Sequence, residues 1–269
     1  MASLGDWTSY DEVASTYDVV AVPHYFRAPA ERLISALDVS PNDDLLDVGA
    51  GTGAVAAAAL SSARLVSATD RSWPMLRLAM RRRVVRCAAA ELLALPFPAR
   101  SFDRVTAGFV LSHVTRPADA VREMARVLRP RGSVGLTSWA LGPSDGEAGL
   151  AWSEVAREFA QATTLAAEIG RALPGEEVLK DLGAVEELLT GGGLDVRHRE
   201  RFRFSISIST ADYLRSRASA VTSRFLRRTL APAAWRLFEA RVGARLSERF
   251  GERLELEAEV NLAIGARRR

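Results

Sequence analysis

The chain has very little of several residue types that define particular classes of protein. Cys87 is the only cysteine among the 269 residues, which excludes an intrachain disulfide and any metal site built from several thiolates. Lys180 is the only lysine, so nearly all of the basic residues are arginine. No uninterrupted apolar run approaches the roughly 18 residues that a membrane-spanning helix needs. These absences predict a globular protein without a metal site or a membrane span.

The charge of the chain does not favour a nucleic-acid partner. The isoelectric point is about 9.5, but the formal net charge is only +3 and the basic residues are spread along the sequence. The N-terminal region carries Asp6, Asp11 and Glu12, and it lacks the basic and apolar segments of a secretion signal. We therefore expect a cytoplasmic protein with no nucleic-acid or membrane partner.

Short apolar segments alternate with helix-like segments between residues 44 and 140. This alternation is typical of βαβ units around a parallel sheet. One helix is expected to begin at Pro117 and to end in a type I turn over residues 129–132, which contain proline and glycine. The strands predicted in this part of the chain are 45–48, 65–68, 84–88, 104–110 and 133–139.

The pattern changes after Trp139, where glycine, proline and serine interrupt the chain over residues 142–146. Apolar residues then recur at helical spacing, except over 196–208, where they alternate as in a half-buried strand. The elements predicted after the interruption are helices at 147–169 and 175–189, a strand at 196–208, helices within 210–250 and a strand at 254–264.

The predicted fold class is α/β, with a Rossmann-like, seven-stranded and mostly parallel sheet, helices on both faces and helical cap insertions. The divisions expected along the chain are an N-terminal helical segment (1–43), the sheet core (44–140), a helical cap insertion (141–192) and the last two strands (193–269) with their inserted helical region (210–250).

A glycine-rich turn follows the first predicted strand, where residues 47–53 read D-V-G-A-G-T-G. Glycines at such a turn let backbone N–H groups approach a ligand closely. The pattern starting at Gly49 also fits the dinucleotide-binding sequence G-x-G-x-x-A, with Asp70 at the distance of a ribose-binding acid. Asp47 favours another ligand, because its carboxylate would repel a pyrophosphate and attract a cationic sulfonium or ammonium group.

The segment 47–53 resembles motif I of the class I S-adenosylmethionine-dependent methyltransferases, in particular the ubiquinone-biosynthesis-like branch (methyltransferase type 11). Further segments resemble the same family in the same order, so the resemblance covers about residues 45–139. These segments are D-R-S-W-P-M-L (70–76), E-L-L-A-L-P-F-P (91–98), S-F-D through F-V-L-S-H-V (101–114) and V-L-R-P-R-G (127–132).

The resemblance implies that S-adenosylmethionine is the cofactor and that the N-terminal segment, with Tyr17, closes over it. Asp47 would serve the methionyl end, Asp70 the ribose, and Glu91 the adenine. Glu91 stands where the family usually has aspartate, and Arg131 stands where it usually has glycine. The implied cofactor-binding residues are Tyr17, Asp47, Gly49, Ala50, Gly51, Asp70, Arg71, Met75, Glu91, Leu92 and Phe109.

His113 is the candidate for general base. Methyl transfer from a sulfonium is an in-line displacement, so the protein mainly has to align donor and acceptor. An oxygen or nitrogen acceptor can also need to lose a proton, and His113 follows the fourth strand, where side chains face the ligand crevice. The alternative is a histidine hydrogen-bonded at the start of the following helix. Met75 is explained equally well as a contact to adenine and as a core residue.

The predicted function is S-adenosylmethionine-dependent methyl transfer to a small molecule, with oxygen favoured modestly over nitrogen or carbon. The alternatives are methylation of nucleic acid and binding of the cofactor without catalysis. The segment 109–112 reads F-V-L-S, unlike the N-P-P-Y loops of enzymes that methylate amino groups of nucleic acids. The acceptor is expected to lie in one cavity lined by both helical insertions and by residues 17–27. No oligomeric state is indicated.

Overall fold

The computed structural model describes residues 9–84 and 86–267. Asp6 of the N-terminal region, Val85 of the third predicted strand and residues 268–269 lie outside the described residues.

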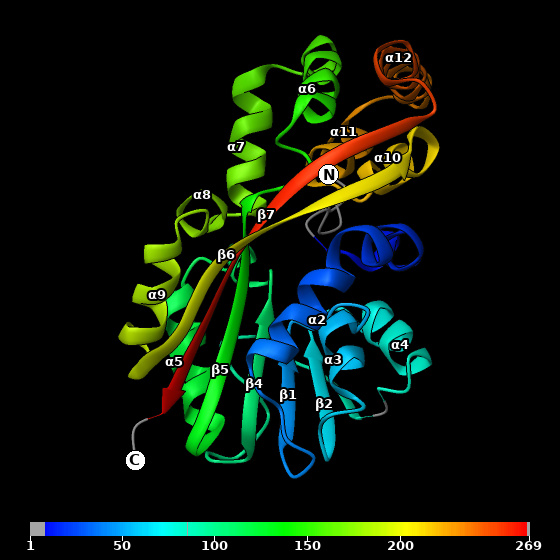
Figure 1. The fold of residues 1–269 in the computed structure, drawn as a ribbon. Helices are drawn as coiled ribbons and strands as arrows, with labels where there is room; N and C mark the ends of the chain where they lie inside the picture. The colour runs from blue at the N-terminus through cyan, green and yellow to red at the C-terminus, as the bar shows by residue number, and fades with distance from the viewer. Residues whose placement is uncertain (1–8, 85, 268–269) are drawn as a thin grey trace.

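The centre of the fold is a sheet made of β1 (Asp44–Val48), β2 (Leu65–Asp70), β3 (Arg86–Ala89), β4 (Phe102–Gly108), β5 (Leu128–Leu141), β6 (Leu194–Ser209) and β7 (Arg253–Arg267). The strand order is β3-β2-β1-β4-β5-β7-β6 (Figure 1). Strands β1 to β5 run parallel to one another, and β7 is antiparallel to both β5 and β6. The predicted seven-stranded, mostly parallel sheet is confirmed.

Helices cover both faces of this sheet. On one face lie α2 (Arg27–Ala36), α3 (Ala54–Ala59) and α4 (Trp73–Arg81), and on the other lie α5 (Pro117–Val127) and α9 (Leu182–Gly191) (Figure 1). Leu45 and Leu46 of β1 are both fully buried, and each belongs to the apolar core on a different face. Strands of parallel sheets read as continuous apolar runs for this reason.

The antiparallel pair of β6 and β7 is longer than the other strands of the sheet and carries a second layer of helices. Its far half extends beyond the other strands towards α6 (Glu147–Phe159), α10 (Thr210–Arg217), α11 (Val221–Thr229) and α12 (Pro232–Phe250) (Figure 1). Ile206 and Ile208 of β6 share one core with Trp152 of α6 and Phe238 of α12. Both helical insertions therefore meet over one apolar face of the β6–β7 pair.

The helices of the first insertion are shorter than predicted. The region predicted as one helix at 147–169 instead forms α6 and α7 (Ala162–Ala172), separated at residues 160–161, and the region predicted as one helix at 175–189 instead forms α8 (Glu176–Leu179) and α9. The second break has a local cause, because the Asp181 side chain accepts a hydrogen bond from the Ala184 N–H (2.9 Å) and so caps a new helix. Helix α9 packs on the core sheet, against α5, β6 and β7.

The type I turn predicted at 129–132 is wrong, because α5 passes directly into β5 at Leu128. Leu128 pairs with Phe102 of β4, and the next described pair is Ser133 with Arg104, so the register shifts across residues 129–132. Arg131 adopts φ +67° within this irregular part of the strand. Pairing with β4 thus replaces the local turn that the sequence suggests.

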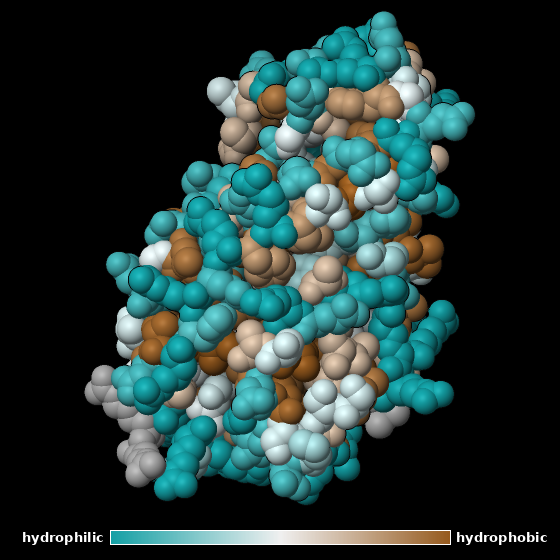
Figure 2. Space-filling model, in the orientation of Figure 1, coloured by the Kyte–Doolittle hydropathy of each residue, from teal (hydrophilic) through white to brown (hydrophobic). Residues whose placement is uncertain are grey.

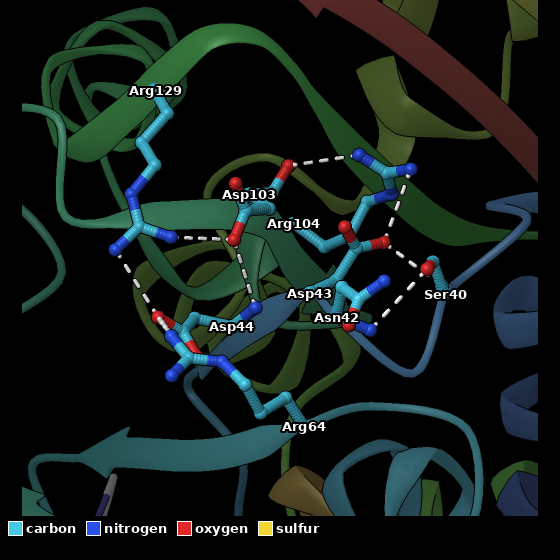
Figure 3. A network of polar contacts seen from close by, with 8 residues as sticks. All are labelled: Ser40, Asn42, Asp43, Asp44, Arg64, Asp103, Arg104 and Arg129. Carbon is cyan, nitrogen blue, oxygen red and sulfur yellow. Dashed lines mark hydrogen bonds and ion pairs between the residues drawn. The ribbon is translucent and has the colours of Figure 1, made fainter.

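The N-terminal ends of β1 and β4 are joined by a network of ion pairs (Figure 3). Asp44 accepts hydrogen bonds from Arg64 (2.5 Å) and Arg129 (3.1 Å). Asp103 of β4 accepts from Arg129 (2.5 Å) and from the Asp44 N–H (2.9 Å). Arg129 therefore bridges the carboxylates of two neighbouring strands, and this end of the sheet is held by compensated charge.

Among the residues that the structure describes, no helix is both long and apolar enough to cross a membrane. On the face shown in Figure 2, apolar residues form separate groups between hydrophilic side chains.

Candidate functional site

A cavity of about 390 Å³ opens at the C-terminal ends of β1, β2 and β4. This edge of an open α/β sheet is where ligands usually bind, and the volume suits a small-molecule site. All but two of the predicted site residues line it, namely Tyr17, Gly49, Gly51, Asp70, Arg71, Met75, Glu91, Leu92, Phe109 and His113. The exceptions, Asp47 and Ala50, line a small adjoining cavity of about 40 Å³ that shares Tyr17, Gly49 and Phe109 with the larger one.

The glycine-rich turn is shaped by close packing and by backbone conformation. Gly49 has φ +64°, and a Cβ atom there would lie 2.3 Å from Cγ2 of Val110. Gly51 has φ +54° with open space around it, and its N–H donates to Asp70 Oδ2 (2.8 Å). The first glycine is needed for packing against Val110, in the segment after β4, whereas the second leaves room beside the cavity.

Asp70 is the last residue of β2, and backbone N–H groups hold both of its carboxylate oxygens. Oδ2 accepts from Gly51 N–H and Oδ1 from Ser72 N–H, each at 2.8 Å. Burial raises the pKa of Asp70, while these hydrogen bonds lower it. Each oxygen keeps a lone pair for a further donor, so the side chain is oriented and able to accept from vicinal hydroxyls.

Asp47 is only 1% exposed. Its Oδ1 accepts from the Thr106 hydroxyl (2.9 Å), and its Oδ2 accepts from the Ala56 N–H in the first turn of α3 (3.0 Å). Burial raises the pKa of Asp47 to about 7, because the two hydrogen bonds only partly offset the loss of hydration. The carboxyl thus titrates near neutral pH and would be stabilised in its charged form by a cation.

Aromatic rings form one wall of the cavity. The η2 segment (Tyr17–Phe26), a π-helix, supplies Tyr17 and Phe26, which stack with ring centroids 5.3 Å apart. Phe109 contacts Phe26 at 5.2 Å and Trp139 at 4.3 Å. Phe109 has φ +61°, an unusual conformation for a residue other than glycine, directly after β4. This wall is suited to an apolar or planar ligand.

His113 lies in η3 (Leu111–His113), the short helix after β4. Its ring meets Tyr10 edge-on, with centroids 5.5 Å apart. Burial, with the nearby guanidinium groups of Arg224 and Arg71, lowers the pKa of His113 to about 4, although a hydrogen bond to the backbone of Ala172 opposes the shift. The imidazole is therefore neutral at neutral pH.

Sequence reasoning missed part of the cavity wall. Trp139 lies near the C-terminal end of β5, so the rule that strand ends face the crevice could have identified it. The other missed residues come from segments that carry no motif, and only the folded chain brings them to the strand ends. Phe26, Leu173 and Glu176 fall within the segments expected to line the cavity but were not named as site residues, whereas Tyr10 and Trp139 lie outside those segments.

The expectation that both insertions line one cavity holds only for the first. Residues of α11 instead line a neighbouring cavity of about 670 Å³, which shares Arg71 and Glu91 with the candidate site. Arg224 of α11 lies over the Tyr10 ring (4.1 Å) and donates to the Ser9 carbonyl (2.7 Å). The second insertion thus contacts the N-terminal segment that borders the site. In the described part of the chain, no cluster of side chains could hold a metal ion.

The amino-acid sequence is similar to a known protein family and to characterised relatives. The family described as methyltransferase domain matches residues 46–136. Nocamycin O-methyltransferase of Saccharothrix syringae is 38% identical over 153 residues, which are 50% of this chain and 54% of that protein, so the chain spans about half the length of that relative. Malonyl-[acyl-carrier protein] O-methyltransferase of Halorhodospira halophila is 32% identical over 97% of this chain and 94% of that protein.

A solved structure shows the same fold. It is phosphoethanolamine N-methyltransferase 2 of Haemonchus contortus, in complex with phosphomonomethylethanolamine and S-adenosylhomocysteine. It is 17% identical with a TM-score of 0.60, over 100% of this chain and 61% of that one.

Proposed function

Because the chain belongs to the class I S-adenosylmethionine-dependent methyltransferases, we propose that it transfers the methyl group of S-adenosylmethionine to an oxygen atom of a small molecule. The observation that supports this best is the single cavity that contains Asp70, the glycine-rich turn, an aromatic wall and His113. A donor site and an acceptor site would thus share one cavity at the strand ends.

The residues of the cavity fit this cofactor. Asp70 presents oriented carboxylate oxygens for the ribose hydroxyls, and Gly51 leaves space for close approach of the cofactor. Leu92 and Met75 are buried apolar residues on the cavity wall, suited to an adenine ring. We propose that Asp47 attracts the positive charge of the methionyl end from the adjoining small cavity.

When bound, S-adenosylmethionine supplies a methyl group on a cationic sulfur. The S–CH₃ bond breaks as a CH₃–O bond forms, and the acceptor hydroxyl loses a proton. We assign His113 as the group that receives this proton, because its neutral imidazole lines the same cavity. A pKa of about 4 makes it a weak base, so an acidic hydroxyl of the phenol or enol type suits it better than an alcohol.

The proposal is tested by calorimetry with S-adenosylmethionine, followed by turnover of an acceptor panel measured as S-adenosylhomocysteine release. We expect micromolar affinity for the cofactor and methylation of at least one hydroxyl-bearing small molecule. Tighter binding of NAD than of S-adenosylmethionine would refute the cofactor assignment. Cofactor binding without turnover of any small molecule or nucleic acid would instead favour a binding protein that does not catalyse.

A further inference from the structure

Glu176 is the only carboxylate that the first insertion places in the wall of the candidate cavity, within the described residues. It is the first residue of α8, a helix of four residues. The cavity wall on this side also includes Leu173, from the loop between α7 and α8, and His113. The insertion therefore brings an acidic group to the side of the cavity that also holds the candidate base.

The position of Glu176 is set by contacts at both ends of α8. At the start, the Gly175 N–H donates to the Ser112 carbonyl (3.1 Å), and a Cβ atom on Gly175 would lie only 3.1 Å from the Leu111 carbonyl oxygen. At the end, the Leu179 carbonyl accepts from the Ser138 hydroxyl (2.7 Å) and from the Asn261 side chain (3.1 Å). Contacts to η3, β5 and β7 thus fix this short helix over the strand ends.

The Glu176 carboxylate has no hydrogen bond or ion pair with any described residue. Lys180 lies nearby but pairs with Glu177 (3.1 Å) and approaches Asp145 (4.0 Å). The charges that face Glu176 are those of Lys180, Arg217, Asp145 and Glu177, and burial is the main reason that its pKa is raised. A partly buried carboxylate without a donor is costly, and a ligand that donates a hydrogen bond removes this cost.

The chemistry of a carboxylate distinguishes between possible acceptors. Beside a hydroxyl, it accepts a hydrogen bond and makes the oxygen more nucleophilic. Beside an amine, it stabilises the ammonium form, which has no lone pair to attack the methyl group. An acceptor with a carboxylate or phosphate at this point would be repelled.

We infer that Glu176 binds the methyl acceptor, and that the acceptor is an uncharged, largely apolar molecule whose O–H group donates to this carboxylate in the bound state and loses its proton to His113 only as the methyl group is transferred. The inference rests on the proposed function, and it assigns to one residue of the cap the choice of oxygen over nitrogen. Glu177 provides a matched control, because its neighbouring carboxylate is 88% exposed and pairs with Lys180 instead.

The test measures ligand binding to the complex of the full chain with S-adenosylhomocysteine, so that no turnover is needed. The probes are 2-naphthol, 2-naphthoate and 2-naphthylmethylamine. Ligand-observed NMR measures the binding of each. We expect the wild-type complex to prefer 2-naphthol, and Glu176→Gln to weaken its binding at least tenfold. Glu177→Gln should bind 2-naphthol as the wild type does, and both variants should keep the wild-type affinity for S-adenosylhomocysteine.

Equal binding of 2-naphthol by a folded Glu176→Gln variant would overturn the role of Glu176, as would preference of the wild type for 2-naphthoate or 2-naphthylmethylamine. Failure of all three probes to bind would overturn the assignment of an apolar acceptor. Failure of S-adenosylhomocysteine itself to bind would be a failure of the proposed function. Because Glu176→Asp keeps the charge on a shorter side chain, it should retain part of the 2-naphthol affinity if the carboxylate is the binding group.

Discussion

The two ends of the parallel strands use acidic residues in opposite ways. At the N-terminal ends, Asp44 and Asp103 are paired with arginines that bridge neighbouring strands (Figure 3). At the C-terminal ends, Asp47, Asp70 and Glu176 form no ion pair with any residue in the described ranges 9–84 and 86–267. Asp47 and Asp70 accept hydrogen bonds from neutral groups, most of them backbone N–H groups.

We propose that this difference separates residues that hold the fold together from residues that bind a ligand. A carboxylate that meets arginine is already compensated and has little to gain from a cation or a hydroxyl. A buried carboxylate that meets only neutral donors remains under-compensated, and its pKa is raised, as for Asp47 and Asp70. The comparison predicts that substitutions at the first end change stability, whereas carboxylate substitutions at the second end mainly change ligand affinity.

The largest effect is expected for Gly49→Ala, which should destabilise the glycine-rich turn at the C-terminal end of β1. The new methyl group would overlap Val110 and the residue would keep a positive φ, so the free energy of unfolding should fall by about 2 to 5 kcal/mol. Gly51→Ala is the control, because it has a positive φ but no neighbour within 4 Å, and it should lose only about 1 to 2 kcal/mol. Urea unfolding measures both, and equal losses would contradict the packing argument.

Asp70→Asn should weaken S-adenosylmethionine binding by about 1.5 to 3 kcal/mol, roughly ten- to a hundredfold, because charge-assisted hydrogen bonds to the ribose are lost. Calorimetry measures this effect. Asp103→Asn removes a carboxylate from the opposite end of the sheet and should leave the affinity unchanged. Wild-type affinity in a folded Asp70→Asn variant would remove the ribose assignment.

Asp44→Asn should lower the free energy of unfolding by about 1 to 2 kcal/mol without changing cofactor affinity. The carboxylate is buried, but Arg64 and Arg129 are 59% and 36% exposed, so solvent screens the pair and the loss is smaller than for a fully buried one. Asp119→Asn, which breaks an exposed pair with Arg122 within α5, should change stability by less than about 0.5 kcal/mol. Urea unfolding measures both variants. Similar losses would show that burial of Asp44 does not increase the contribution of its ion pairs to the free energy of unfolding.

The smallest effect concerns pH. Because the pKa of Asp47 is about 7 without ligand and a cationic ligand favours the carboxylate, binding should release a proton and strengthen as pH rises. Affinity for S-adenosylmethionine should fall about tenfold from pH 8 to pH 6, and Asp47→Asn should abolish this dependence. A pH-independent affinity in the wild type would exclude contact between Asp47 and the positive charge.

The stability of the ligand-free protein should depend on pH in the opposite direction. A carboxyl whose pKa is raised by folding contributes stability at low pH that is lost towards pH 7.

The core of the fold was predictable because its signals are local. Continuous apolar runs such as Leu45–Leu46 mark strands buried on both faces, and the glycine pattern from Gly49 marks the turn after the first strand. Local signals failed where pairing with another strand decided the outcome. Residues 129–132 resemble a turn, yet β5 already begins at Leu128 because that residue pairs with Phe102.

The sequence by itself determined the sheet, the glycine-rich turn and the acidic residue that ends β2, because each depends on neighbouring residues and on the period of the strand. Only the tertiary structure decided that Tyr10, Trp139 and Glu176 line one cavity with His113, since these residues come from segments far apart in the chain. It also decided that Asp47 is buried beside Thr106 and titrates near neutral pH. The physical reason is that burial and the charges around a group are set by long-range packing, which no local pattern of residues encodes.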